Sequence, residues 1–279
     1  GKQAASKHTT ATYNTYIGSE AGEFSTGGTN NTVVGRQAWG VGVGTGGDNV
    51  VMGSLALLSG TSAAENVIIG YNAAGNATTT QRTVVIGNDA ALGLAGGSNN
   101  EDGVFIGEGA GGTAVSGMRN TLVGKSAGGS AYAALKESTF IGASAGAGVS
   151  GAYNTFVGYS AGSSSNSTTN TTGVGFNVIQ EVTGNANTAL GFGVMADGAG
   201  DGGANVGVGS RSLQALTGGD RNIGVGNYTL SAVTTYNDNI AIGYEAGKKI
   251  NTSNNTVIGS RAGEKQAGGS GNNILIGAW

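Results

Sequence analysis

The stretch from Asn154 to Gly162 reads NTFVGYSAG, and close copies of it stand at residues 14–22 (NTYIGSEAG), 120–128 (NTLVGKSAG) and 255–263 (NTVIGSRAG). When the chain is aligned on the glycine that ends each short apolar run, it contains sixteen copies spaced 16 to 20 residues apart. A nearly fixed period over a whole chain is the signature of a solenoid, in which each repeat stacks on its neighbours. The sequence therefore predicts one solenoid domain over residues 14–279, preceded by a polar leader or linker over residues 1–13.

Positions are numbered below from the aligned glycine, so that in the repeat ending at Gly18 the residue Ile17 is at position −1 and Ser19 at position +1. Position −1 is aliphatic or Met in every copy, and position −3 is β-branched in every copy. Residues two apart in a strand share one face, and β-branched side chains suit a pleated, buried surface. We therefore expect a short strand over positions −3 to −1 of each repeat, with positions −3 and −1 facing the core of the coil.

The glycine and the residue at position −4 have separate physical roles. A glycine at the end of every strand indicates positive φ or a close approach of another backbone. Position −4 is Asn in 12 of the 16 copies, and stacked Asn side chains can hydrogen-bond to one another along a ladder of equivalent rungs.

Position −2 carries no charged residue in any copy, although we expect it to point away from the core. A parallel strand that is apolar on both faces is covered on both faces, so the sequence predicts that another copy of the chain covers this one. The side chains assigned to that interface are Val85, Phe105, Leu122, Phe140, Phe156, Val257 and Leu275. Position −2 is also large in several copies where position +4 is Gly, and small in several where position +4 is large, as close packing of one shared space requires. The coupling is partial, because it fails for Val33 with Trp39, Val51 with Leu57 and Ala241 with Gly247. The sequence leaves open whether that space lies within one chain or between chains.

The N-T/S-x-I-G-x-x-A unit resembles the head repeat of trimeric autotransporter adhesins, and it is similar to glycine-rich repeat regions of bacteriophage tail fibres. The similarity covers about residues 14 to 277. It implies a left-handed parallel β-roll wound as a homotrimer, whereas the residues themselves predict only more than one chain. The repeats are longer than is usual for the family, and the chain contains no heptad stalk or membrane anchor, which favours a tail fibre.

The composition limits the kinds of site that the chain can form. The 279 residues include 57 Gly and no Pro or Cys, with 38% apolar and 10% charged residues and a net charge of −3. No basic block indicates nucleic-acid binding, and no apolar run of membrane-spanning length is present. With His8 as the one histidine, we expect no metal site, no Ser-His-Asp triad and no cofactor. The segment GVGVGTGG at residues 40–47 lacks the following helix that a phosphate loop needs.

Two surface features remain as candidate sites. Position +1 is Tyr159, Phe176 and Phe192 in three successive repeats, which predicts an exposed aromatic stripe where a sugar ring could stack. A structural ladder covering the turn is the other interpretation. Paired carboxylates could hydrolyse a glycan, as in a tailspike enzyme, and the candidates are Glu20, Glu23, Glu101, Asp102 and Glu108. Acidic residues in turns are more often simply solvated.

These features predict a non-enzymatic, extracellular protein, located on a virion or a bacterial cell surface, that binds a surface glycan or an outer-membrane receptor. A tail-fibre segment is the first choice, and an autotransporter head and a polysaccharide-degrading tailspike are the alternatives. An ice-binding solenoid needs an exposed array of threonines, and we expect none here because position −3 is assigned to the inner face.

Overall fold

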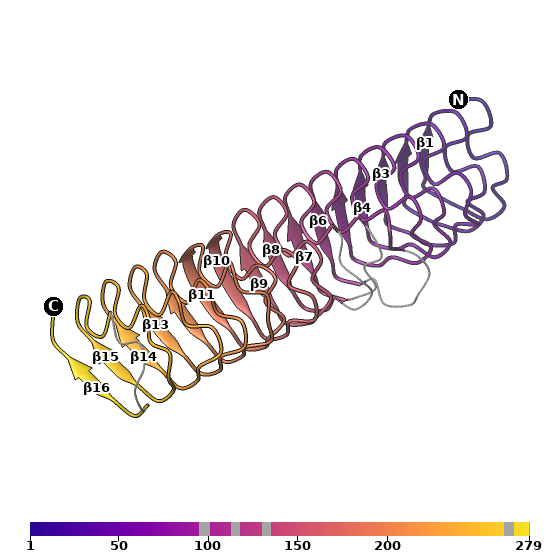
Figure 1. The fold of residues 1–279 in the computed structure, drawn as a ribbon. Coiled ribbons are helices and arrows are strands. Elements are labelled where there is room, and N and C mark those ends of the chain that lie inside the picture. The colour runs from indigo at the N-terminus through magenta and orange to yellow at the C-terminus, as the bar shows by residue number, and fades with distance from the viewer. Residues whose placement is uncertain (95–100, 113–117, 130–134, 265–270, 279) are drawn as a thin grey trace. The chain divides into compact units, whose positions relative to one another are not determined.

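A computed structural model describes residues 1–94, 101–112, 118–129, 135–264 and 271–278. The chain divides into two compact units, Gly1–Ser144 with strands β1 to β8 and Ala145–Trp279 with strands β9 to β16, and each is described by itself. Within each unit all strand pairs are parallel and follow chain order, so each unit is a parallel β-solenoid, as predicted (Figure 1). No helix occurs among the described residues.

The strands fall where the repeat places them. Their bounds are β1 Thr15–Ile17, β2 Thr32–Val34, β3 Val50–Met52, β4 Val67–Ile69, β5 Val84–Ile86, β6 Val104–Ile106, β7 Thr121–Val123, β8 Thr139–Ile141, β9 Thr155–Val157, β10 Thr172–Phe176, β11 Thr188–Phe192, β12 Val206–Val208, β13 Ile223–Val225, β14 Ile240–Ile242, β15 Thr256–Ile258 and β16 Ile274–Ile276.

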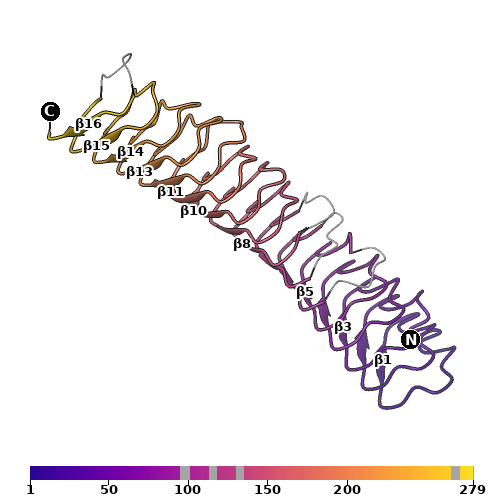
Figure 2. The ribbon, with the colours of Figure 1, turned by 90° about the horizontal axis from the view of Figure 1, so that it is seen from below.

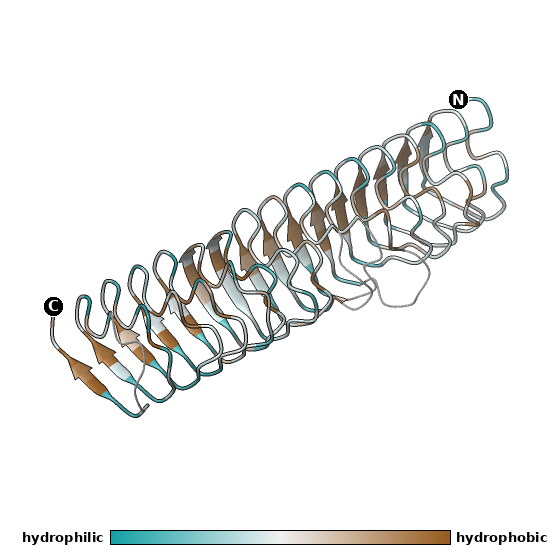
Figure 3. Ribbon diagram, viewed as in Figure 1, coloured by the Kyte–Doolittle hydropathy of each residue, from teal (hydrophilic) through white to brown (hydrophobic). Residues whose placement is uncertain are grey.

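The strand register reproduces the repeat alignment position by position. Thr172 pairs with Thr188 and Val84 with Val104, so rung lengths run from 16 to 20 residues. In each unit the strands line one side of the coil and the connecting loops lie on the other (Figure 2). Apolar residues concentrate in the strands, and many of the turns are hydrophilic (Figure 3).

The prediction of which strand face meets the core is wrong. The middle residue of the strand, at position −2, is the buried one, and positions −3 and −1 point outward. Phe140 and Phe156 are 0% exposed within a single chain, whereas Ile141 and Leu190 at position −1 are 41% and 49% exposed. The alternation along the strand was assigned correctly, but a strand with apolar residues on both faces does not identify its inner face by hydropathy alone.

Each coil is narrow enough that positions −2 and +4 share one space inside it. A Cβ added at Gly162 would lie 2.4 Å from the Phe156 ring, and one at Gly111 would lie 2.7 Å from the Phe105 ring. Where position −2 shrinks to Gly207, a Cβ would instead meet Val194, Met195 and Leu213. The large-with-small pattern therefore reflects packing within one chain.

The aligned glycines form a column in which successive backbones touch. Gly175 has φ +136°, and a Cβ added to it would lie 1.7 Å from the carbonyl oxygen of Gly191. Both predicted reasons for the glycine are confirmed at this position, because the backbone there is left-handed and also closely approached.

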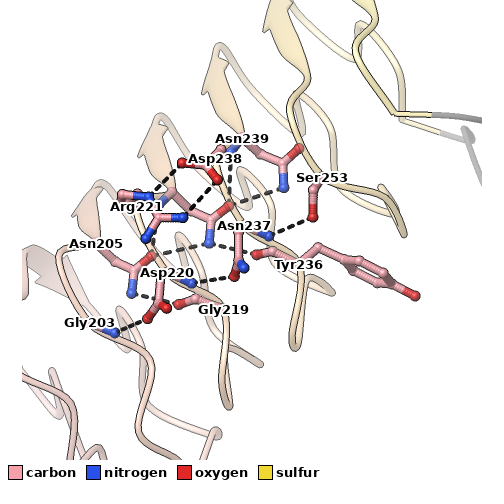
Figure 4. A network of polar contacts seen from close by, with 11 residues as sticks. Gly203, Asn205, Gly219, Asp220, Arg221, Tyr236, Asn237, Asp238, Asn239 and Ser253 are labelled. Atoms are coloured by element: carbon pink, nitrogen blue, oxygen red, sulfur yellow. Dashed lines mark hydrogen bonds and ion pairs between the residues drawn. The ribbon is translucent and has the colours of Figure 1, made fainter.

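The predicted Asn ladder is present and runs inside the coil. Asn222 donates from Nδ2 to Oδ1 of Asn205 at 3.1 Å and to the carbonyl of Tyr236 at 2.8 Å, and its own Oδ1 accepts from Nδ2 of Asn239 at 3.1 Å (Figure 4). Asn205, Asn222 and Asn239 are fully buried, so each rung satisfies the polar groups of the next.

A second column, at position −5, lies on the surface, and its charge alternates over five rungs of the first unit that follow Asp48. Glu65, Arg82, Asp102, Arg119 and Glu137 occupy five successive rungs, all with φ between 49° and 58°. Arg82 pairs with Asp102 at 2.6 Å, and Arg119 pairs with Glu137. Opposite charges therefore face each other between neighbouring rungs.

Residues 1–13 continue the coil before β1. The amide nitrogens of Ala5, Lys7 and Thr10 donate to the carbonyls of Ala21, Glu23 and Thr26, at 3.0, 3.1 and 3.1 Å. The His8 ring meets Tyr16 edge to face, with centroids 4.7 Å apart. This segment, described as a polar leader from its sequence, forms a first rung over the end of the core.

Candidate functional site: an aromatic row at the margin of an apolar sheet face

The side chains at position +1 belong to the outward face of the sheet. Strands β10 and β11 continue through the aligned glycine as far as Phe176 and Phe192, so positions −3, −1 and +1 alternate with buried position −2. The outward face therefore has two inner columns, −3 and −1, and a marginal column at +1.

The marginal column of the second unit holds the predicted stripe, defined here as the aromatic row Tyr159, Phe176 and Phe192. Ring centroids are 5.3 Å apart at both steps, with interplanar angles of 14° and 4°. The three side chains are 55%, 43% and 48% exposed. The structure thus brings all three predicted residues together, stacked and open to solvent.

A cationic extension continues the aromatic row toward the C-terminus. The Arg211 guanidinium lies 6.0 Å from the Phe192 ring centroid and 5.4 Å from that of Tyr228, and its Nη1 donates to the Tyr228 hydroxyl. Lys248 lies 5.2 Å from the same Tyr228 ring. Cations held over ring faces at these distances are in cation–π range.

Sequence reasoning missed Arg211 and Tyr228, which belong to position +2. The pattern that could have revealed them is a cation and an aromatic residue at the same position of consecutive repeats, next to the aromatic run at position +1.

The inner columns of the outward face are apolar or hydroxyl-bearing throughout both units. In the second unit no residue at positions −3, −1 or +1 is charged. In the first unit the charges Arg36, Glu108 and Lys125 are all at position +1. The face is therefore an uncharged strip that is bordered by charge in the first unit and by aromatic rings in the second.

The residues assigned to a trimer interface lie elsewhere than predicted. Six of them are 0–2% exposed inside a single coil, and only Leu275, on the last strand, is partly exposed. The six are Val85, Phe105, Leu122, Phe140, Phe156 and Val257. Because their own chain covers them, the surface that a partner could reach is the opposite strand face.

The acidic residues considered for glycan hydrolysis each have a partner. Arg82 pairs with Asp102 and, at 3.0 Å, with Glu101, and its hydrogen bond holds the pKa of Asp102 below the ordinary value. Glu108 pairs with Lys125 at 3.1 Å. A carboxyl with a lowered pKa is poorly suited to act as a general acid near neutral pH.

The carboxylates near the N-terminal end are similarly engaged. Glu23 lies 3.9 Å from Lys7, and Glu20 accepts a hydrogen bond from Gln37 at 2.7 Å. Over the described ranges, no group of three or more His, Asp or Glu side chains could hold a metal ion. No helix in the same ranges has the length and hydropathy to cross a bilayer.

Comparisons with known proteins identify no relative of this chain. No family model matches the sequence, and no curated protein and no solved structure matches it significantly.

Proposed function

We propose that the chain is a structural and adhesive segment of a homotrimeric fibre, most like that of a bacteriophage tail, which binds a bacterial surface glycan without catalysis. The observation that carries this proposal is the pair of uncharged inner columns, positions −3 and −1, on the outward face of the sheet. A parallel sheet that is apolar on both faces is normally covered on both, and here the chain covers one.

The size of the face supports association between copies. Eight strands about 4.8 Å apart, each spanning the two residue steps of about 3.3 Å from position −3 to position −1, make a strip of roughly 250 Å² in each unit. Two copies that each bury the strips of both units would cover roughly 1,000 Å² in total, the area at which specific interfaces begin, and would leave the marginal column free. The side chains of this face form ridges that repeat at the strand spacing. Another copy of the chain has a face with the same spacing, so the ridges of the two copies can interlock. Threefold closure is taken from the family resemblance.

Solution mass tests the proposal. Light scattering on the wild-type chain should give a multiple of 27.1 kDa, threefold for the homotrimer. Lysine at two outward positions, Leu190→Lys with Ile242→Lys, should yield a species of single-chain mass with the far-UV circular dichroism unchanged, because a desolvated charge opposes association. Thr235→Lys, on an exposed position outside the strands, is the matched control and should stay assembled.

A monomeric wild type would remove the basis of the proposal. An assembled double-lysine variant would show that the copies meet elsewhere. The head of a bacterial trimeric autotransporter adhesin is the alternative biological setting for the same architecture. A tailspike enzyme is the weaker alternative, because the acidic candidates Glu101, Asp102 and Glu108 are held in ion pairs.

Ice binding becomes a second candidate because of the corrected strand orientation. The Thr residues at position −3, such as Thr172 and Thr188, are exposed rather than internal. The aliphatic residues at position −1 favour association over ice binding, so we expect no thermal hysteresis from the assembled protein. If the protein were monomeric and depressed the freezing point below the melting point, the outward strand face would be an ice-binding surface.

A further inference from the structure

The marginal column has different chemistry in the two units. In the first unit it carries Arg36, Glu108 and Lys125, which shows that this column is suited to contact with water. In the second unit the same column holds three exposed aromatic rings in succession. Exposed aromatic rings on a column that otherwise suits water mark a binding surface.

We infer that the aromatic row, together with Arg211, binds an acidic glycan chain lying along the coil. This inference rests on the proposed adhesive function and names the ligand class and its residues. Tyr159, Phe176, Phe192 and Arg211 come from four consecutive rungs, which span roughly 15 Å at the strand spacing, enough for a short oligosaccharide.

The stacking leaves part of each ring face open. Carbon atoms in contact lie about 3.5–4.0 Å apart, so parallel rings with centroids 5.3 Å apart are offset sideways by about 3.5–4 Å. Part of each ring face therefore extends beyond the neighbouring ring, which agrees with side-chain exposures of 43% to 55%. The apolar C–H face of a sugar can pack on this open part of the ring, while its hydroxyls remain in water.

Arg211 supplies the preference for a negative charge. Its guanidinium lies between the Phe192 and Tyr228 rings and, among the described residues, pairs with no carboxylate, unlike Arg82, Arg221 and Arg261. The hydrogen bond to the Tyr228 hydroxyl fixes its position and leaves other donors available. A carboxylate of a uronic acid can accept two parallel hydrogen bonds from a guanidinium.

The test is titration calorimetry with a panel of uronate oligosaccharides and their carboxyl-reduced, neutral counterparts. The wild-type protein should bind at least one acidic member about tenfold more tightly than its reduced counterpart. Arg211→Gln should abolish that preference while retaining weak binding of the reduced form. Phe176→Thr with Phe192→Thr should weaken binding of both forms by about tenfold or more.

Tyr71→Thr is the matched control, because Tyr71 is an exposed aromatic at position +1 whose neighbours in that column are Ser54 and Asn88. It should leave both affinities unchanged. The inference is overturned if no member of the panel binds, if acidic and reduced forms bind equally, or if Arg211→Gln leaves the preference intact. These outcomes with the multimer intact reject the glycan site alone, whereas a monomeric wild type rejects the proposed function.

Discussion

At the scale of single residues, the aligned glycines set how closely two rungs can approach. Along the strands, Cβ atoms point alternately into the coil and out of it, but at the aligned position the carbonyl of the next rung occupies the Cβ site. The left-handed backbone there adds a second restriction. A residue with a side chain would meet steric overlap and backbone strain together.

Gly175→Ala should therefore destabilise the chain by about 3 kcal/mol or more, because its Cβ would lie 1.7 Å from the Gly191 carbonyl oxygen and its φ is +136°. Thermal unfolding followed by circular dichroism measures the effect. Gly218→Ala is the control, since its Cβ would meet its nearest neighbour, Asp201, at 3.5 Å with no positive φ. Equal melting temperatures for the two variants would contradict this account of the glycine column.

At the scale of elements, the first rung contains His8, the one histidine of the chain. The Nε2 atom of His8 is buried and, within the described part of the chain, has no hydrogen-bond partner. Burial lowers the pKa of His8 below its ordinary value of 6.5. Its neighbour in the chain, Lys7, lies over the Phe24 ring and pairs with Glu23 of the next rung.

This predicts a pH-dependent first rung. Well above pH 6.5 the imidazole is neutral whether the rung is folded or open, so its contribution to stability is fully present. As the pH falls below 6.5, the open state takes up the proton first and stability is lost through the lowered folded pKa. Amide exchange at Ala5, Lys7 and Thr10 should therefore accelerate, after correction for intrinsic rates, between about pH 7 and pH 5.

His8→Gln should remove this pH dependence, and exchange in β3 to β5 should not share it. If the acceleration persists in His8→Gln, then another group controls the first rung.

At the scale of the whole molecule, much of the architecture follows from the repeat. The parallel strands, the Asn ladder through Asn205, Asn222 and Asn239, and the glycine column were predictable because each depends on one residue type recurring in register. The aromatic row was predictable for the same reason, although its glycan ligand remains a proposal.

The inner and outer strand faces could not be told apart by hydropathy, because both are apolar. The compensating sizes of positions −2 and +4 contained the answer, since Phe156 opposite Gly162 implies a common, closely packed interior. Arg211 could not be placed over Phe192 from sequence, because that contact joins position +2 of one rung to position +1 of the rung before it.

The alternating charges at position −5 from Glu65 to Glu137 respond differently to one added repeat and to two. Asp102 lies between Arg82 and Arg119, and Arg119 pairs in turn with Glu137. Duplication of one such repeat within this tract would place like charges on adjacent rungs, whereas duplication of two would preserve the alternation. Insertion of an even number of repeats in this tract therefore keeps opposite charges on adjacent rungs, whereas an odd number interrupts them, as the acidic neighbours Asp48 and Glu65 do where the tract begins.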